Sequence, residues 1–141
     1  MCSGQTLAPG RATGPVIVLS EPLSFWGGFD ALTGCVTDRR HPQAGRCLSG
    51  AIVVMPAGRG SSSASSVLAE AIRAGTAPAG IIMSEPDSIV ALGAIVAQEL
   101  YGLACPVIVL ARADFTALRE GMQLSIEADD AGASVYEGVS A

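Results

Sequence analysis

The chain has 141 residues, half of them hydrophobic and only 4% aromatic, with a formal net charge of −5. This length and composition predict one folded domain, residues 1–141, with an aliphatic core, and they exclude a disordered chain. The acidic balance argues against a nucleic-acid partner. The longest apolar stretch, residues 89–97, is too short to cross a membrane. The N-terminus lacks a charged segment followed by an apolar run, so we expect a cytoplasmic protein.

Short apolar runs separated by glycine, proline and polar turns predict the class α/β. The continuous runs are typical of strands that are buried on both faces. The predicted strands span residues 7–14, 16–19, 35–38, 52–55, 80–83, 106–110, 122–128 and 134–139. The predicted helices span residues 65–74, 88–101 and 113–120. Because strands and helices alternate through the middle of the chain, we expect parallel pairing there, within a mixed, partly parallel sheet with two or three helices.

One loop, residues 21–30, holds three of the six aromatic side chains. Phe25 and Trp26 lie there beside the pair Gly27-Gly28. They are either core residues or the wall of a ligand pocket or subunit interface. We favour the pocket or interface, because tryptophan is enriched at interfaces and large apolar groups line pockets.

His41, the only histidine, lies in a polar loop that spans residues 39–46. It is either an exposed loop residue or a contact to substrate or partner. A catalytic histidine needs an acid that orients it, and the sequence shows none convincingly. Four of the eight arginines lie between residues 39 and 59, which suits a small anionic ligand.

The four cysteines are scattered and lack the spacing of a zinc or iron–sulfur site. We expect reduced, structural thiols and no metal bound by this chain. A reducing compartment disfavours the alternative, a disulfide between Cys35 and Cys47.

The strand at residues 52–55 runs into a Gly58-Arg59-Gly60 turn, and five serines follow within residues 61–66. The glycines let a ligand approach the backbone closely. Serines at the start of a helix can cap its free N–H groups, and those groups together with the helix dipole attract an anion. Arg59 adds a guanidinium that can hold a carboxylate with two hydrogen bonds. A loop followed by a capped helix is the alternative, but five serines exceed the need of one cap, so we predict an anion site.

Several separated motifs together resemble the small subunit of aconitase X, over about residues 7–128. They are the segments 24–30, 38–42, 56–62, 75–79 and 85–94. The resemblance implies a swivelling β/β/α domain that works as the small subunit of a two-chain hydro-lyase. It also implies that the large subunit holds an iron–sulfur cluster, while this chain alone binds none.

In that family, bacterial members dehydrate cis-3-hydroxy-L-proline to Δ1-pyrroline-2-carboxylate, and archaeal relatives dehydrate mevalonate 5-phosphate. The pair Phe25-Trp26 and the turn at residues 58–62 look like the bacterial version, so we expect hydroxyproline to be the substrate. Mevalonate 5-phosphate is the alternative within the family.

The resemblance also implies roles for individual residues. The superfamily's Gly-x-Gly-Ser-Ser turn, whose first serine acts as the base, matches residues 58–62, so Ser61 is the expected general base. Aconitase has an arginine where this chain has Ser63, which makes Arg59 a candidate replacement for binding the substrate carboxylate. The residues expected to bind substrate are Arg59, Gly60, Ser62, Ser63, Phe25, Trp26, Gly27, Gly28 and His41.

Two other classes of function stay open. A stand-alone swivelling domain could carry a phosphoryl group on His41, and phosphate transfer to the chain would then be lost in His41→Ala. A module without chemistry would instead bind an anion tightly on its own. The partners that we expect are a large aconitase X subunit and a small anionic substrate, with neither nucleic acid nor membrane.

Overall fold

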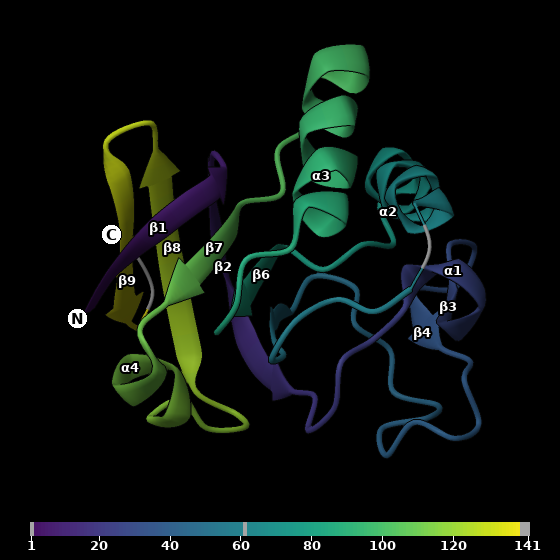
Figure 1. Ribbon diagram of the computed structural model, residues 1–141, viewed down its shortest axis with the longest axis horizontal. Coiled ribbons are helices and arrows are strands. Elements are labelled where there is room, and N and C mark those ends of the chain that lie inside the picture. The colour runs from purple at the N-terminus through teal and green to yellow at the C-terminus, as the bar shows by residue number, and fades with distance from the viewer. Residues whose placement is uncertain (1, 61, 139–141) are drawn as a thin grey trace.

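The computed structural model describes residues 2–60 and 62–138. Seven strands form a mixed sheet that closes on itself, and two long helices cover one side of it (Figure 1). The strands are β1 (Cys2–Ala8), β2 (Gly10–Val18), β3 (Phe29–Asp30), β4 (Cys35–Val36), β5 (Ile52–Val54), β6 (Gly80–Met83), β7 (Val107–Leu110), β8 (Gln123–Asp129) and β9 (Gly132–Glu137). The helices are α1 (Phe25–Gly28), α2 (Ser63–Ala74), α3 (Ser88–Tyr101) and α4 (Arg112–Thr116).

The closed sheet has the strand order β1-β7-β6-β5-β2-β8-β9, and β9 pairs with β1 to complete the ring. Strands β2, β5, β6 and β7 run parallel, as the alternation of strands and helices predicted. The remaining pairs in the ring are antiparallel. The loops that follow β2, β5 and β6 therefore leave the sheet at the same edge.

The parallel strands are buried on both faces, which explains why their sequences are continuously apolar. Ile52 and Val54 of β5 face a core inside the closed sheet. Val53 and Met55 face a second core, between the sheet and the helices α2 and α3. Gly93 lets these two helices approach, because a Cβ atom there would lie 2.8 Å from the carbonyl oxygen of Ser65.

Helix α3 is apolar on nearly all sides, but only one of its faces is buried. Val90, Ala94 and Ala97 pack into the core. Leu92 is 49% exposed, and five of the seven exposed large hydrophobic residues of the described chain lie between Leu92 and Leu103. The sequence left open whether this helix is deeply buried or lies under a partner, and the structure shows an uncovered apolar face.

Three expectations about the first third of the chain were wrong. The strands predicted at residues 7–14 and 16–19 are instead β1, which begins at Cys2 and ends at Ala8, and β2, which is continuous from Gly10 to Val18. Residues 25–28 form the short helix α1 in place of a loop, although Trp26 and Gly27 have non-helical backbone angles. The described residues therefore contain four helices, where two or three were predicted. None of the described helices is both long enough and apolar enough to span a membrane.

The expectation of four reduced thiols was also wrong, because Cys35 and Cys47 form a disulfide. The chain doubles back on itself between them. The N–H of Val36 donates to the carbonyl oxygen of Arg46 at 2.8 Å, which places the two cysteines opposite each other. Cys2 and Cys105 are free.

Candidate functional site

The glycine–serine turn after β5 lies at the sheet edge between the loops that follow β2 and β6. On one side, the N–H of Arg59 donates to the carbonyl oxygen of Leu23 at 3.1 Å. On the other side, the carbonyl oxygen of Pro56 accepts the N–H groups of Ser84 at 3.1 Å and Glu85 at 3.2 Å. Three segments that are distant in sequence thus form one surface, and backbone hydrogen bonds fix their relative positions.

Both glycines of the turn are required by close neighbours. A Cβ atom on Gly58 would lie 2.6 Å from Cγ2 of Val90 and 2.8 Å from Oδ2 of Asp87. Gly60 has a φ of +102°, and a Cβ atom there would lie 2.8 Å from Oγ of Ser24. The turn therefore packs against the start of α3 on one side and against the loop after β2 on the other.

Helix α2 begins directly after this turn. Ser61, the predicted base, lies outside the described residues. Ser62 occupies the position before the helix, and its side chain makes no capping hydrogen bond to the described residues, so the predicted capping role does not hold for this serine. Its carbonyl oxygen instead accepts the hydroxyl of Ser65 at 2.7 Å. Ser62 and Ser63 are both exposed, so a ligand can reach them.

Opposite charges meet at this turn. Nη2 of Arg59 lies 3.8 Å from Oε1 of Glu21, and both side chains are about half exposed, at 54% and 52%. By contrast, Arg46, which precedes Arg59 in the arginine-rich segment, pairs closely with Glu120 at 2.7 Å. Arg59 thus adds a reachable guanidinium to the serine turn, with a carboxylate directly beside it.

His41 is buried, and it fixes the loop that carries Glu21. Its Nδ1 accepts the N–H of Gln43 at 3.0 Å. The ring proton must therefore be on Nε2, which donates to the carbonyl oxygen of Glu21 at 3.1 Å. Neither ring nitrogen is left for a phosphoryl group, and within the described part of the chain His41 is linked to the turn through Glu21.

The two aromatic residues after β2 have different surroundings. Phe25 is buried and packs edge-on against Phe29, with ring centroids 5.1 Å apart, so the structure places it in the core. Gly28 is also buried, whereas Gly27 is exposed. Trp26 is 58% exposed. Ser24 lies against Gly60 and donates its hydroxyl to the carbonyl oxygen of Trp26 at 2.8 Å, so the backbone of Trp26 is linked to the turn through Ser24.

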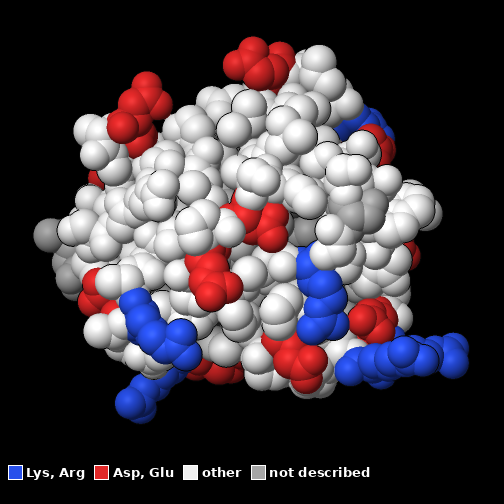
Figure 2. Space-filling model, in the orientation of Figure 1, with Lys and Arg blue, Asp and Glu red and all other residues white. Residues whose placement is uncertain are grey.

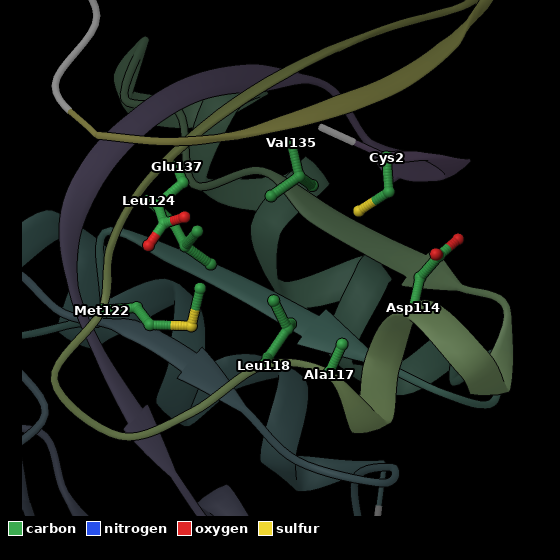
Figure 3. Close-up of a pocket in the computed structure, with 8 residues that line it drawn as sticks. All are labelled: Cys2, Asp114, Ala117, Leu118, Met122, Leu124, Val135 and Glu137. Carbon is green, nitrogen blue, oxygen red and sulfur yellow. The ribbon is translucent and has the colours of Figure 1, made fainter.

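A separate pocket of about 190 Å³ lies among β1, β8, β9 and α4 (Figure 3). Leu118, Met122 and Leu124 form part of its apolar lining, and Asp114 and Glu137 supply two carboxylates. None of its lining residues is a predicted site residue. Since its ionisable oxygens are acidic, this pocket repels a carboxylate or phosphate and does not compete with the serine turn as the predicted anion site.

The thiols of this chain do not fit an iron–sulfur cluster. Two of the four are joined to each other as Cys35–Cys47. Burial raises the pKa of the Cys105 thiol to about 12, which disfavours the thiolate that binds iron. Within residues 2–60 and 62–138, no three His, Cys, Asp or Glu side chains gather as a metal site.

Sequence reasoning did not connect two acidic residues with this surface. Glu21 was treated only as the start of a loop, and Asp87 as part of the turn that begins the next helix, a position that the structure confirms. Oδ1 of Asp87 caps α3 by accepting the N–H groups of Ile89 at 3.0 Å and Val90 at 3.1 Å. The signal that could have found both is their position directly after parallel strands, where loops gather at one edge of a sheet.

Comparisons with known proteins give consistent results. The model of the aconitase X swivel domain matches residues 1–135. Cis-3-hydroxy-L-proline dehydratases from Pseudomonas aeruginosa and Hypocrea jecorina are 50% identical over 73% of this chain and 44% identical over 82% of it. The chain spans only about a fifth of these two relatives, 18% and 19% of their lengths.

Relatives of similar length are also found. The phosphomevalonate dehydratase small subunit of Methanothermobacter thermautotrophicus is 37% identical, and the match covers 89% of this chain and 92% of that protein. The crystal structure of Thermococcus kodakaraensis aconitase X in its holo-form superposes with a TM-score of 0.82 at 35% identity, over 95% of this chain and 96% of that one. The fold predicted from the sequence is confirmed by this superposition.

Proposed function

This chain belongs to the aconitase X swivel-domain family, and from that membership we propose that it is the small subunit of a dehydratase acting on cis-3-hydroxy-L-proline. The two relatives named for that activity are 50% and 44% identical to it. The observation that carries the proposal is the glycine–serine turn that precedes α2, where the exposed side chain of Arg59 is followed along the chain by the exposed serines Ser62 and Ser63. Such a surface suits a small carboxylate.

The proposed reaction removes a proton from the carbon next to the carboxylate and a hydroxyl from the neighbouring carbon, with a carbon–carbon double bond forming between them. The resulting enamine becomes the imine Δ1-pyrroline-2-carboxylate when a proton moves from the ring nitrogen to the carbon that lost the hydroxyl. Ser61 takes the proton, as the matching turn of the superfamily implies. Arg59, Ser62 and the first N–H groups of α2 hold the carboxylate, on which negative charge increases as the proton leaves. The helix dipole and the guanidinium favour the anionic form of a nearby hydroxyl, which strengthens a serine as a base.

The departing hydroxyl needs an acid, and we propose that a large partner subunit supplies it. The family implies an iron–sulfur cluster, and we assign that cluster to the partner because the thiols of this chain do not fit it. The proposed roles of Ser61, Arg59 and Ser62 do not depend on where the cluster lies. Orienting a substrate correctly can itself lower a barrier by about 7–11 kcal/mol, so a domain without metal can still be essential.

Two features of the surface support a large partner. The site residues Arg59, Ser62 and Trp26 are exposed, so another chain is needed to exclude water from the reaction. The uncovered face of α3 offers Leu92 and Ile95 for burial, and the surface over this helix is mostly uncharged in Figure 2. Apolar surface that is concentrated on one helix is typical of an interaction site.

Mevalonate 5-phosphate is the second candidate substrate. It is favoured by the extent of the match, which covers 92% of the Methanothermobacter thermautotrophicus phosphomevalonate dehydratase small subunit. Hydroxyproline is favoured by sequence identity. The test is to co-express the chain with the aconitase X large subunit of the same organism and to assay both substrates. We expect turnover of cis-3-hydroxy-L-proline by the complex and none by either chain alone; turnover of mevalonate 5-phosphate only would refute the proposed substrate.

A further inference from the structure

We propose that Glu21 binds the ammonium group of the substrate, so that Glu21 and Arg59 together select a zwitterionic amino acid. This inference rests on the proposed function, since it places the substrate carboxylate on Arg59. It goes further by assigning a specificity role to a residue outside the serine turn. It also gives a physical reason for preferring hydroxyproline over a phosphate ester that has no amine.

The first support is the position of Glu21. The loop that carries Glu21 is held at both ends, by β5 before Glu21 and by the serine turn after it. Before it, the N–H of Leu19 donates to the carbonyl oxygen of Val54 at 2.8 Å, and after it, Leu23 accepts the N–H of Arg59. In the middle, the buried His41 donates to the carbonyl oxygen of Glu21 itself. The backbone of Glu21 is therefore fixed relative to Arg59, whatever the side chains do.

The second support is that Glu21 and Arg59 lie too far apart for a close, hydrogen-bonded ion pair. Their charged atoms are 3.8 Å apart, which is longer than a hydrogen bond. The ion pair between Arg46 and Glu120 is closer, because its atoms are 2.7 Å apart. Glu120 is also held by a second hydrogen bond, which it accepts from the N–H of Val18 at 2.8 Å. An exposed and loose ion pair is weak, so a ligand can open it at little cost.

The third support is charge complementarity. An α-amino acid carries its ammonium and carboxylate groups on the same carbon, so it can place one against Glu21 and the other against Arg59. Each protein charge then gains a closer partner, and the complex gains no net charge. A phosphate ester without an amine would instead bring its negative charge toward the Glu21 carboxylate and be repelled.

The test compares two inhibitors that differ in one ring atom. L-proline carries the ring ammonium, and tetrahydrofuran-2-carboxylate has an ether oxygen in its place. In the complex of this chain with its large subunit, we expect L-proline to inhibit at least about tenfold more tightly, because the charged group gains an ion pair. In Glu21→Gln this ratio should approach one, and KM for cis-3-hydroxy-L-proline should rise about tenfold while kcat changes little.

Matched variants separate this role from a general effect of charge. Glu85 is an exposed acid on the loop after β6, at the same sheet edge, and Glu85→Gln should keep the inhibitor ratio of the wild type. Glu21→Asp retains the carboxylate and should keep part of that ratio. Because the side chain of Glu21 is half exposed, none of these variants should change the melting temperature appreciably.

The outcomes also separate this inference from the proposed function. If the wild-type complex turns over hydroxyproline and Glu21→Gln keeps the tenfold inhibitor ratio, the role of Glu21 is overturned and the function stands. An equal loss of the ratio in Glu85→Gln would likewise overturn the specific role. If the complex does not turn over hydroxyproline, the proposed function fails, and the inhibitor ratio measured by direct binding still decides the role of Glu21.

Discussion

Asp87→Ala should lower the stability of the domain by about 2 kcal/mol. Asp87 has extended backbone angles and accepts two N–H groups at the start of α3, from Ile89 at 3.0 Å and Val90 at 3.1 Å. Loss of such a cap costs about 0.5–2 kcal/mol, and loss of a negative charge at a helix N-terminus costs about 0.3–1 kcal/mol more. With an unfolding entropy of about 0.3 kcal/mol/K for a chain of this length, the melting temperature should fall by about 7 °C.

The measurement is thermal unfolding followed by circular dichroism, with Asp87→Asn as the matched control. Asparagine caps a helix about as well as aspartate, so only the charge contribution of about 0.3–1 kcal/mol should be lost. The Ala variant should also disturb the serine turn, because Oδ2 of Asp87 lies against Gly58. A melting temperature for Asp87→Ala within 1 °C of the wild type would refute the capping role.

Two further predictions concern the disulfide and the exposed helix face. Reducing the Cys35–Cys47 bond, which spans 12 residues of sequence, should cost roughly 3 kcal/mol by the loop-entropy estimate. Unreduced, unfolded protein should show two titratable thiols; four would contradict the disulfide. Leu92→Glu should weaken association with the large subunit at least about tenfold, because a charge replaces a half-exposed apolar contact. Leu32→Glu, at an 86% exposed leucine elsewhere, serves as control, and equal binding by both variants would argue against an interface at α3.

The sequence predicted the central strands and the long helices, because their apolar patterns carry the physical cause of these elements, but it missed the start of β1, which has no apolar run. Residues 80–83 were predicted as a strand and form β6, and residues 88–101 were predicted as a helix and form α3. Both segments are apolar along nearly their whole length. Gly102 follows directly and caps the end of α3 in the left-handed conformation.

What the sequence did not reveal depends on contacts between distant segments. The Cys35–Cys47 bond requires the chain to double back, and thiol spacing alone does not report that geometry. The pairing of Glu21 with Arg59 arises because β2 and β5 are parallel neighbours whose following loops meet. His41 offered only two alternatives in the sequence, and its buried contact with Glu21 depends on the folding of two loops against each other.

The central claim is that a serine of the turn is the base in a reaction completed by another chain. The most direct measurement is turnover of cis-3-hydroxy-L-proline by the reconstituted complex that carries Ser61→Ala. We expect kcat to fall by about 10²–10⁴-fold, the usual contribution of a general base, while the two subunits associate as in the wild type. Ser66→Ala, at an exposed position within α2, should keep full activity. Near-normal turnover by Ser61→Ala would contradict the claim.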